Sequence, residues 1–422
     1  MAYISRVRRY CGVGVVLAAV LLVGSCRGST QTVKDAEGQG VVANPNRPVQ
    51  LLLRERADKL STGDVEGYLA ALSPPARAFE EPIAKVAVTL PVTRFDLSVG
   101  EATISDDGNH FRNASVTLTY WYKELPADNA FRVRLLYDLD RQSAGWVVTK
   151  SQFDRRPFVP PPPELWPFGP VGFTRSPHFL VMARPGTRGV PEMAAVAEKA
   201  YAGLVPTLPV ASDDRVLLVV AGNRKEYLDN AGDPTSVALA PFALVPAGGG
   251  LLRPEERRVF ADLTALLAPG RLPLDNSPDP IEPETVFRHE LAHLALSRFT
   301  RACTSDWVVE GAAMQLAGEH RSDQWKALAS GGKLDGAVLN SVPPNYALAD
   351  AAVDYLVQTG GAAKFLDFYR NFKNLPEQGC SGQVGNVRSR VDERLLRRYY
   401  RFGVTDLEGF ARDYIRKAVA AP

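Results

Sequence analysis

The sequence PETVFRHELAHLAL, from Pro283 to Leu296, contains the pattern HExxH. It predicts a helix, because Pro283 suits a first helical turn and the leucines and alanines that follow favour helix. His289 and His293 are four residues apart on that helix, so both imidazoles can reach one metal ion. Glu290 lies about a quarter turn away, beside the ion's open position, and is the expected general base.

A third metal ligand is expected at Glu310, within the stretch DWVVEGAA from Asp306 to Ala313. It follows His293 by 17 positions (310 − 293), enough for the first helix to end and a second helix to pass the metal. Two imidazoles and one carboxylate leave a fourth tetrahedral position for water, which is typical of catalytic rather than structural zinc sites. The sequence therefore predicts a catalytic Zn²⁺ site.

The two motifs together, HELAH and WxxEGxA, resemble those of the gluzincin zinc metallopeptidases, the group of thermolysin and aminopeptidase N. The resemblance covers roughly Arg258 to Phe372 and is closest to the small peptidase-MA-like domains of bacterial secreted proteins and lipoproteins. It implies a zincin domain, a Zn²⁺ cofactor and a peptide or protein substrate.

A further stretch, YALADAAVDYLVQTGG from Tyr346 to Gly361, resembles the family's helix that begins with an oxyanion-stabilising tyrosine. By this resemblance, Tyr346 would donate a hydrogen bond to the developing oxyanion. The alternative is an aromatic residue that packs in the core or at a helix entry.

The chain also departs from the family. Between Val219 and Val286 no stretch matches the Gly-x-Met-Glu-Asn motif that grips a free amino terminus, so an aminopeptidase is not supported. Met314 stands where thermolysin has an aspartate that orients a ligating histidine. The partner that fixes the histidine tautomer is therefore not predicted from the sequence.

The N-terminus has the features of an export signal, with a basic start and an apolar stretch from Val13 to Val23. The tetrapeptide VGSC, ending at Cys26, resembles the lipobox of bacterial lipoproteins. We therefore expect residues 1–26 to be a lipoprotein signal, with lipid on Cys26 as the membrane anchor on the outer face of the cytoplasmic membrane. Without lipidation the protein would be secreted. Residues 27–48 are expected to form a flexible tether.

Residues 49–154 are expected to form a small α+β domain. Two short helical patterns are followed by strands that alternate at period two, an order similar to NTF2-like cone domains. Its aromatic residues are expected in the core rather than around a ligand. The proline-rich residues 155–170 predict a stiff linker. Residues 171–422 then form the metallopeptidase domain, with a mixed sheet, active-site helices and a helical C-terminal part, so the overall class is α+β.

Composition limits the partners. The chain has 422 residues, 45% of them hydrophobic, and a net charge of +2, which favours no nucleic-acid partner. In an oxidising compartment Cys303 and Cys380 could form a disulfide, although two separate thiols are equally compatible with the sequence. Nothing in the sequence indicates an oligomeric state.

These features predict an exported zinc metallopeptidase in which Glu290 is the base and Tyr346 assists. The alternative is a catalytically inactive lipoprotein that keeps a zincin scaffold and acts as a cell-surface binding protein. Hydrolysis of a non-peptide bond would use the same site.

Overall fold

The computed structural model describes most of the chain. The described residues are 32–34, 40–42, 47–100, 102–105, 107–155, 164–207, 215–231, 242–243, 258–263, 282–301, 304–341, 345–374 and 384–420. The predicted signal, Cys26, Cys303 and Cys380 lie outside them. Within the described residues, no helix is both long and apolar enough to pass through a bilayer.

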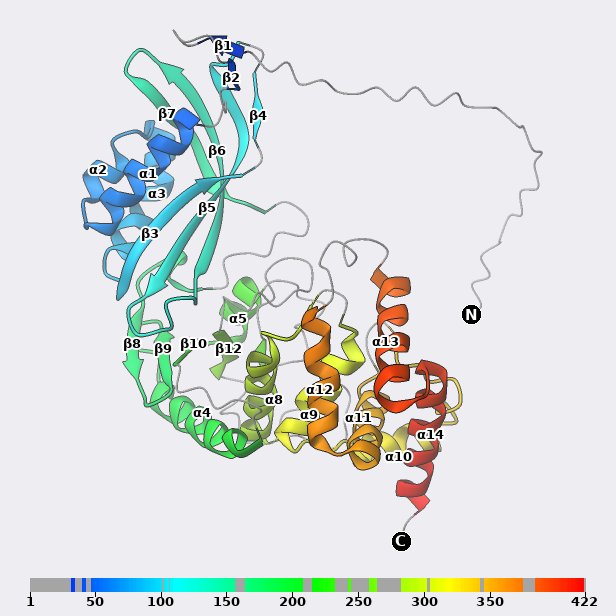
Figure 1. Cartoon of the computed structure of the whole chain (residues 1–422). Helices are drawn as coiled ribbons and strands as arrows, with labels where there is room; N and C mark the ends of the chain where they lie inside the picture. Colours follow the sequence, from blue (N-terminus) through cyan, green and yellow to red (C-terminus); the bar gives the residue numbers. More distant parts are fainter. Residues whose placement is uncertain are drawn as a thin grey trace, which may run out of the picture. The chain divides into compact units, whose positions relative to one another are not determined.

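The chain divides into two compact units, Met1–Arg47 and Pro48–Pro422. In the first unit, which includes most of the expected tether, strands β1 (Thr32–Lys34) and β2 (Gly40–Val42) pair antiparallel. The second unit contains the other described elements, and its first helix begins at the boundary residue Arg47 (Figure 1).

Three helices open the second unit. They are α1 (Arg47–Ser61), α2 (Val65–Leu69) and α3 (Pro74–Ala87). The sequence pattern predicted the first two but not α3, which begins with two prolines and contains Pro82. Proline is tolerated in a first turn, whereas an internal proline removes a hydrogen bond and usually breaks a helix. The buried face of α3, which includes Ala76 and Ile83, keeps this segment helical against the neighbouring sheet.

The first large sheet is antiparallel, in the order β3-β5-β6-β7, with β4 paired to β5. Its strands are β3 (Val92–Val99), β4 (Thr103–Ile104), β5 (His110–Tyr122), β6 (Phe131–Gln142) and β7 (Gly145–Phe153). Buried and half-buried residues alternate along β5 and β6, as the period-two pattern predicted. Tyr120 and Tyr122 are buried in the core, in agreement with the expectation for the aromatic residues.

The second large sheet has the order β11-β12-β10-β9-β8. Its strands are β8 (Gly172–Arg175), β9 (Phe179–Ala183), β10 (Val216–Ala221), β11 (Phe242–Ala243) and β12 (Arg258–Asp262). The three central strands are parallel, and an antiparallel strand lies at each edge, so the sheet is mixed as predicted. The sequence did not predict β8.

The two faces of this second sheet belong to two different cores. Val181 and Leu218 pack with the helices that follow them in the chain. Their neighbours Leu180 and Leu217 pack instead with the helices and strands of residues 49–148. Because both faces are covered, the central strands are continuously apolar rather than alternating.

A buried ion pair lies between the two sheets. Arg258 of β12 donates to Glu164 at 2.9 Å, and both side chains are at most 2% exposed. The other oxygen of Glu164 accepts from Tyr122 at 2.8 Å and from Trp166 at 3.0 Å. Glu164 and Trp166 lie within the expected linker 155–170, of which residues 156–163 are not described. The last part of that segment, from Glu164 onward, is therefore packed in the core rather than being an exposed spacer.

The remaining elements are helical. They are α4 (Val190–Leu204), α5 (Arg224–Ala231), α8 (Pro283–Leu296), α9 (Asp306–Ala317), α10 (Ser322–Ser330), α11 (Tyr346–Gly360), α12 (Ala362–Arg370), α13 (Val384–Tyr400) and α14 (Val404–Ala420). The sequence predicted α8, a second helix carrying Glu310, the helix that begins at Tyr346 and a helical C-terminal part, but it did not predict α10. Helices α8, α9 and α11 pack side by side (Figure 1). The chain is thus a mixed α and β protein, in agreement with the expected α+β class.

Candidate metal centre

Helix α8 brings the two predicted histidines together. Pro283 is in its first turn, and His289 and His293 follow on one face with 7% and 6% of their surface exposed. Their Nε2 atoms are 3.0 Å apart, and the two rings are nearly perpendicular at 80°. The predicted helix is confirmed, and it places both imidazoles as one chelating pair.

Helix α9 brings the third predicted residue to the same place. Oε2 of Glu310 lies 3.3 Å from Nε2 of His289 and 3.6 Å from Nε2 of His293. An ion with ligands at about 2.0–2.1 Å in a tetrahedron separates neighbouring ligand atoms by about 3.3 Å. The three observed separations bracket that value. The structure therefore brings His289, His293 and Glu310 into one triangle of metal-ligand size.

The hydrogen bond to His289 also fits a cation at the centre of the triangle. Nδ1 of His289 lies 2.8 Å from Oε2 of Glu319, so in the neutral imidazole its proton is on Nδ1 and the lone pair is on Nε2. That lone pair faces the Nε2 atom of His293 and the Glu310 carboxylate. Nδ1 of His293 is buried without a hydrogen-bond partner among the described residues. A bound cation would satisfy all three inward-facing atoms.

Glu319 is the histidine partner that the sequence did not predict. Gly318 ends α9 with a left-handed φ of 66°, and Glu319 comes directly after it. One carboxylate oxygen binds His289, and the other accepts from Arg321 at 2.6 and 2.8 Å. Carboxylates that hold a ligating histidine fix its tautomer and ring orientation. No local sequence pattern marks this residue, because its position depends on the turn that follows α9.

The electrostatics of the triangle follow from these contacts. Burial lowers the pKa of His289, but Glu319 and Glu310 more than offset this and raise it well above its usual value. Burial would raise the pKa of Glu310, yet His293 and His289 hold it well below its usual range. For Glu319, the effect of burial is outweighed by His289 and Arg321, which lower the pKa to about 2. In the absence of metal, an imidazolium therefore balances the carboxylates.

Glu290 follows His289 on α8 and is half-buried. Burial raises the pKa of its carboxyl, while the two histidines oppose the rise. Tyr227 of α5 lies nearby. Burial raises the pKa of its hydroxyl, and the negative charge of Glu290 raises it further. The Tyr227 hydroxyl is buried without a hydrogen-bond partner among the described residues. No sequence pattern indicated that Tyr227 would lie on this side of the site.

Tyr346 opens α11 beside the same network. Asn345 caps the helix by accepting from the backbone N–H of Leu348 at 3.0 Å. The Arg321 guanidinium, which binds Glu319, lies 4.8 Å from the centre of the Tyr346 ring. The side chains of Arg321 and Glu319 therefore connect the Tyr346 ring to His289. Its role towards an oxyanion stays a prediction.

Helices α9 and α11 approach each other closely at Gly311, the residue after Glu310. A Cβ atom there would lie 2.5 Å from Cγ2 of Val353 and 2.7 Å from the carbonyl oxygen of Ala349. At the start of α9, Asp392 of α13 accepts from Trp307 at 3.0 Å. The position of Glu310 is therefore set by packing along the whole of α9.

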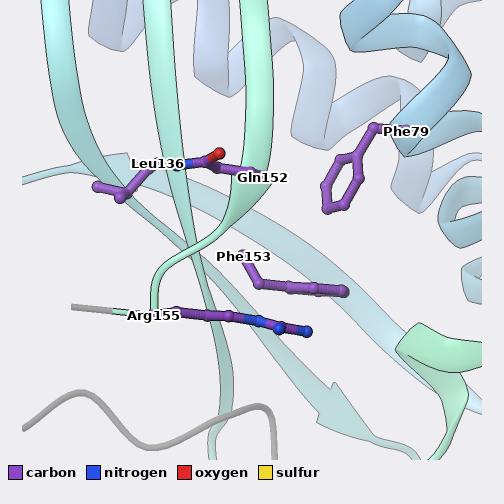
Figure 2. A pocket seen from close by; sticks show the side chains of 5 residues that line it. All are labelled: Phe79, Leu136, Gln152, Phe153 and Arg155. Carbon is purple, nitrogen blue, oxygen red and sulfur yellow. The ribbon is translucent and has the colours of Figure 1, made fainter. Parts of the chain in front are cut away.

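A separate hollow of about 520 Å³ lies in the N-terminal half of the second unit (Figure 2). Its lining residues are Phe79, Leu136, Gln152, Phe153 and Arg155. None of the candidate metal ligands lines it, and Phe79 and Phe153 make an edge-to-face contact with ring centres 5.1 Å apart. The hollow therefore has no part in the metal centre.

In comparisons with known proteins, neither a family model nor a curated protein matches this chain. Its function is therefore inferred from its residues and their geometry.

Proposed function

We propose that the protein is a zinc-dependent metallopeptidase. The observation that carries the proposal is the triangle of His289, His293 and Glu310, with inward-facing atoms 3.0, 3.3 and 3.6 Å apart. Its donor set, two imidazoles and one carboxylate, leaves one position open, as catalytic zinc sites do. When bound, zinc lowers the pKa of water towards neutrality and polarises a carbonyl oxygen.

The residues of the chain have separate roles in this proposal. His289 and His293 bind through Nε2, and Glu319 keeps the first of them in the correct tautomer. Glu290 accepts the proton of the water that attacks the peptide carbonyl and then gives that proton to the leaving amine. Tyr346 would donate a hydrogen bond to the oxyanion, as the family resemblance implies.

An edge strand supports a peptide as substrate. Strand β11 lies at the edge of the second sheet, antiparallel to β12, and contacts α8. An extended peptide can pair with the edge strand of a sheet through its main chain. That arrangement would bring a substrate beside the helix that contains the general base.

The proposed setting is the outer face of the cytoplasmic membrane, with a lipid on Cys26 as the anchor. Secretion is the expected outcome if Cys26 is not lipidated. We further infer that residues 49–154 form an NTF2-like domain, which the order of three helices before an antiparallel sheet supports.

The proposal is tested in two steps on the full chain. Zinc content is measured first: about one ion per chain at the triangle is expected in the wild type, and His293→Ala should lose it. Hydrolysis of a fluorogenic peptide library follows. Glu290→Gln should keep the zinc but reduce turnover by about 10²–10⁴-fold, because it removes only the general base.

Glu284→Gln on the same helix is the matched control, because Glu284 pairs with Lys199 and not with the metal ligands. It should keep both zinc and turnover. Zinc binding without hydrolysis of any peptide would overturn the peptidase and favour a binding protein with a zincin scaffold. Absence of zinc in metal-supplemented wild type would overturn the site itself.

A further inference from the structure

A second group of metal-binding side chains lies close to the first. It consists of His320, Asp350 and Asp354, which each offer one ligand atom within 4.8 Å of the others. The two aspartates are four residues apart on α11, so their carboxylates lie on one face. His320 lies between α9 and α10, and its Nδ1 atom is 3.7 Å from Oδ2 of Asp354.

The two carboxylates are buried with few partners. Asp350 is 1% exposed and accepts one hydrogen bond, from the backbone N–H of Arg321 at 2.9 Å. Asp354 is 8% exposed and has no hydrogen bond within the described parts of the chain; its ionic neighbour there is His320. Burial of a carboxylate is unfavourable unless charge or donors compensate. A cation between the three side chains would provide that compensation.

We propose that His320, Asp350 and Asp354 form a second divalent-cation site with the ligand preference of Zn²⁺. The imidazole favours a first-row transition ion or zinc over Ca²⁺ and Mg²⁺, which prefer oxygen ligands alone. Neighbouring ligands of zinc are about 3.3 Å apart, so the 3.7 Å gap closes with a small movement of His320. The His320 side chain is 58% exposed, which leaves it free to move and leaves room for water as a further ligand.

The segment Glu319–Arg321 connects this site to the first one. Glu319 binds His289, the next residue belongs to the second site, and Arg321 both binds Glu319 and donates its backbone N–H to Asp350. An ion at the second site therefore fixes the segment that orients His289. This coupling rests on the proposed zinc site, whereas the second site itself does not.

The experiment counts zinc ions bound to the full chain, first stripped of metal, over a range of buffered free Zn²⁺ concentrations. We expect about two ions per chain in the wild type. Asp354→Asn should lose the weaker ion, which is bound at the second site. It should keep the tighter ion at the first site, with an affinity reduced about 10-fold, because a contact that orients a ligand is lost. His293→Ala should lose the tighter ion and keep the weaker one.

A control variant and two further measurements distinguish loss of the site from misfolding. Asp413→Asn is the matched control, because its carboxylate is 61% exposed on α14 and should leave both ions bound. Circular dichroism of Asp354→Asn must match the wild type, and added zinc should raise the unfolding midpoint of His293→Ala but not of the double variant His293→Ala/Asp354→Asn.

The outcomes separate the two proposals. A single ion that only His293→Ala removes would overturn the second site and leave the metallopeptidase centre standing. A single ion that only Asp354→Asn removes would overturn the first centre and support the second. Two ions with an unchanged affinity at the tighter site in Asp354→Asn would overturn the coupling.

Discussion

Gly311→Ala is expected to destabilise the protein and to weaken metal binding, because α9 packs closely against α11 at Gly311. The added Cβ would meet a side-chain carbon of Val353 at 2.5 Å and the carbonyl oxygen of Ala349 at 2.7 Å. The backbone oxygen cannot rotate away, so the helices must separate. Glu310 is the adjacent residue and would move with its helix.

The magnitude follows from two opposing effects. Overpacking of a core costs about 1–3 kcal/mol, and the higher helix propensity of alanine returns about 1 kcal/mol. We expect a net loss of about 2 kcal/mol in the free energy of unfolding, near the upper end because one clash is with backbone. Gly409→Ala is the matched control, since a Cβ there has no atom within 4 Å, and it should stabilise by up to about 1 kcal/mol.

The assay is denaturant unfolding of both variants with a chelator present, followed by zinc titration. Val353→Ala combined with Gly311→Ala should recover part of the loss, because it removes one of the two close contacts, and a double-mutant cycle measures this share. Unfolding of Gly311→Ala at the same denaturant concentration as Gly409→Ala would contradict this prediction. A loss of stability in Gly311→Ala with the zinc affinity of the wild type would contradict the expected effect on Glu310.

Three further predictions concern other contacts. Glu319→Gln should weaken zinc binding about 10–100-fold by removing the carboxylate that orients a ligating histidine, and an unchanged affinity in competition with a chelator would contradict this. Burial raises the pKa of Asp350 to about 8, so in metal-free protein the folded carboxyl is protonated while the unfolded one is not. The Asp350 carboxyl should therefore make stability fall as pH rises towards 8, by about 2 kcal/mol between about pH 5.5 and 7. Asp350→Asn should remove this share of the slope in urea unfolding and leave the share of His289 and Glu290, whose pKa values are also raised. Arg258→Met leaves Glu164 buried without its cation and should cost about 3–5 kcal/mol, whereas the added change Glu164→Gln should recover much of it.

The candidate metal ligands could be predicted because the spacing of the two histidines is a local property. The four-residue interval between His289 and His293 gives one helix face whatever the rest of the chain does. Glu310 needed only a second helix that packs beside the first. The structure brings these three residues together, and it confirms the alternating strands of the first sheet.

Glu319 could not be predicted, because its role depends on how a turn directs one side chain after a helix ends. The position where the resemblance suggested an orienting residue holds Met314, which is buried in the helical core. Similarly, Pro82 argued against a helix that tertiary packing nevertheless maintains. In both cases the deciding contacts come from residues distant in sequence.

The sheet with two covered faces limits how this protein could have changed during evolution. Leu217, Val219 and Phe260 pack against the N-terminal half, so a gene that lost that half would leave an apolar surface facing water. Exchange of the C-terminal half alone, by recombination with another gene, would meet the same difficulty. The two halves are therefore expected to be inherited together, with substitutions on one side of their contact matched by substitutions on the other.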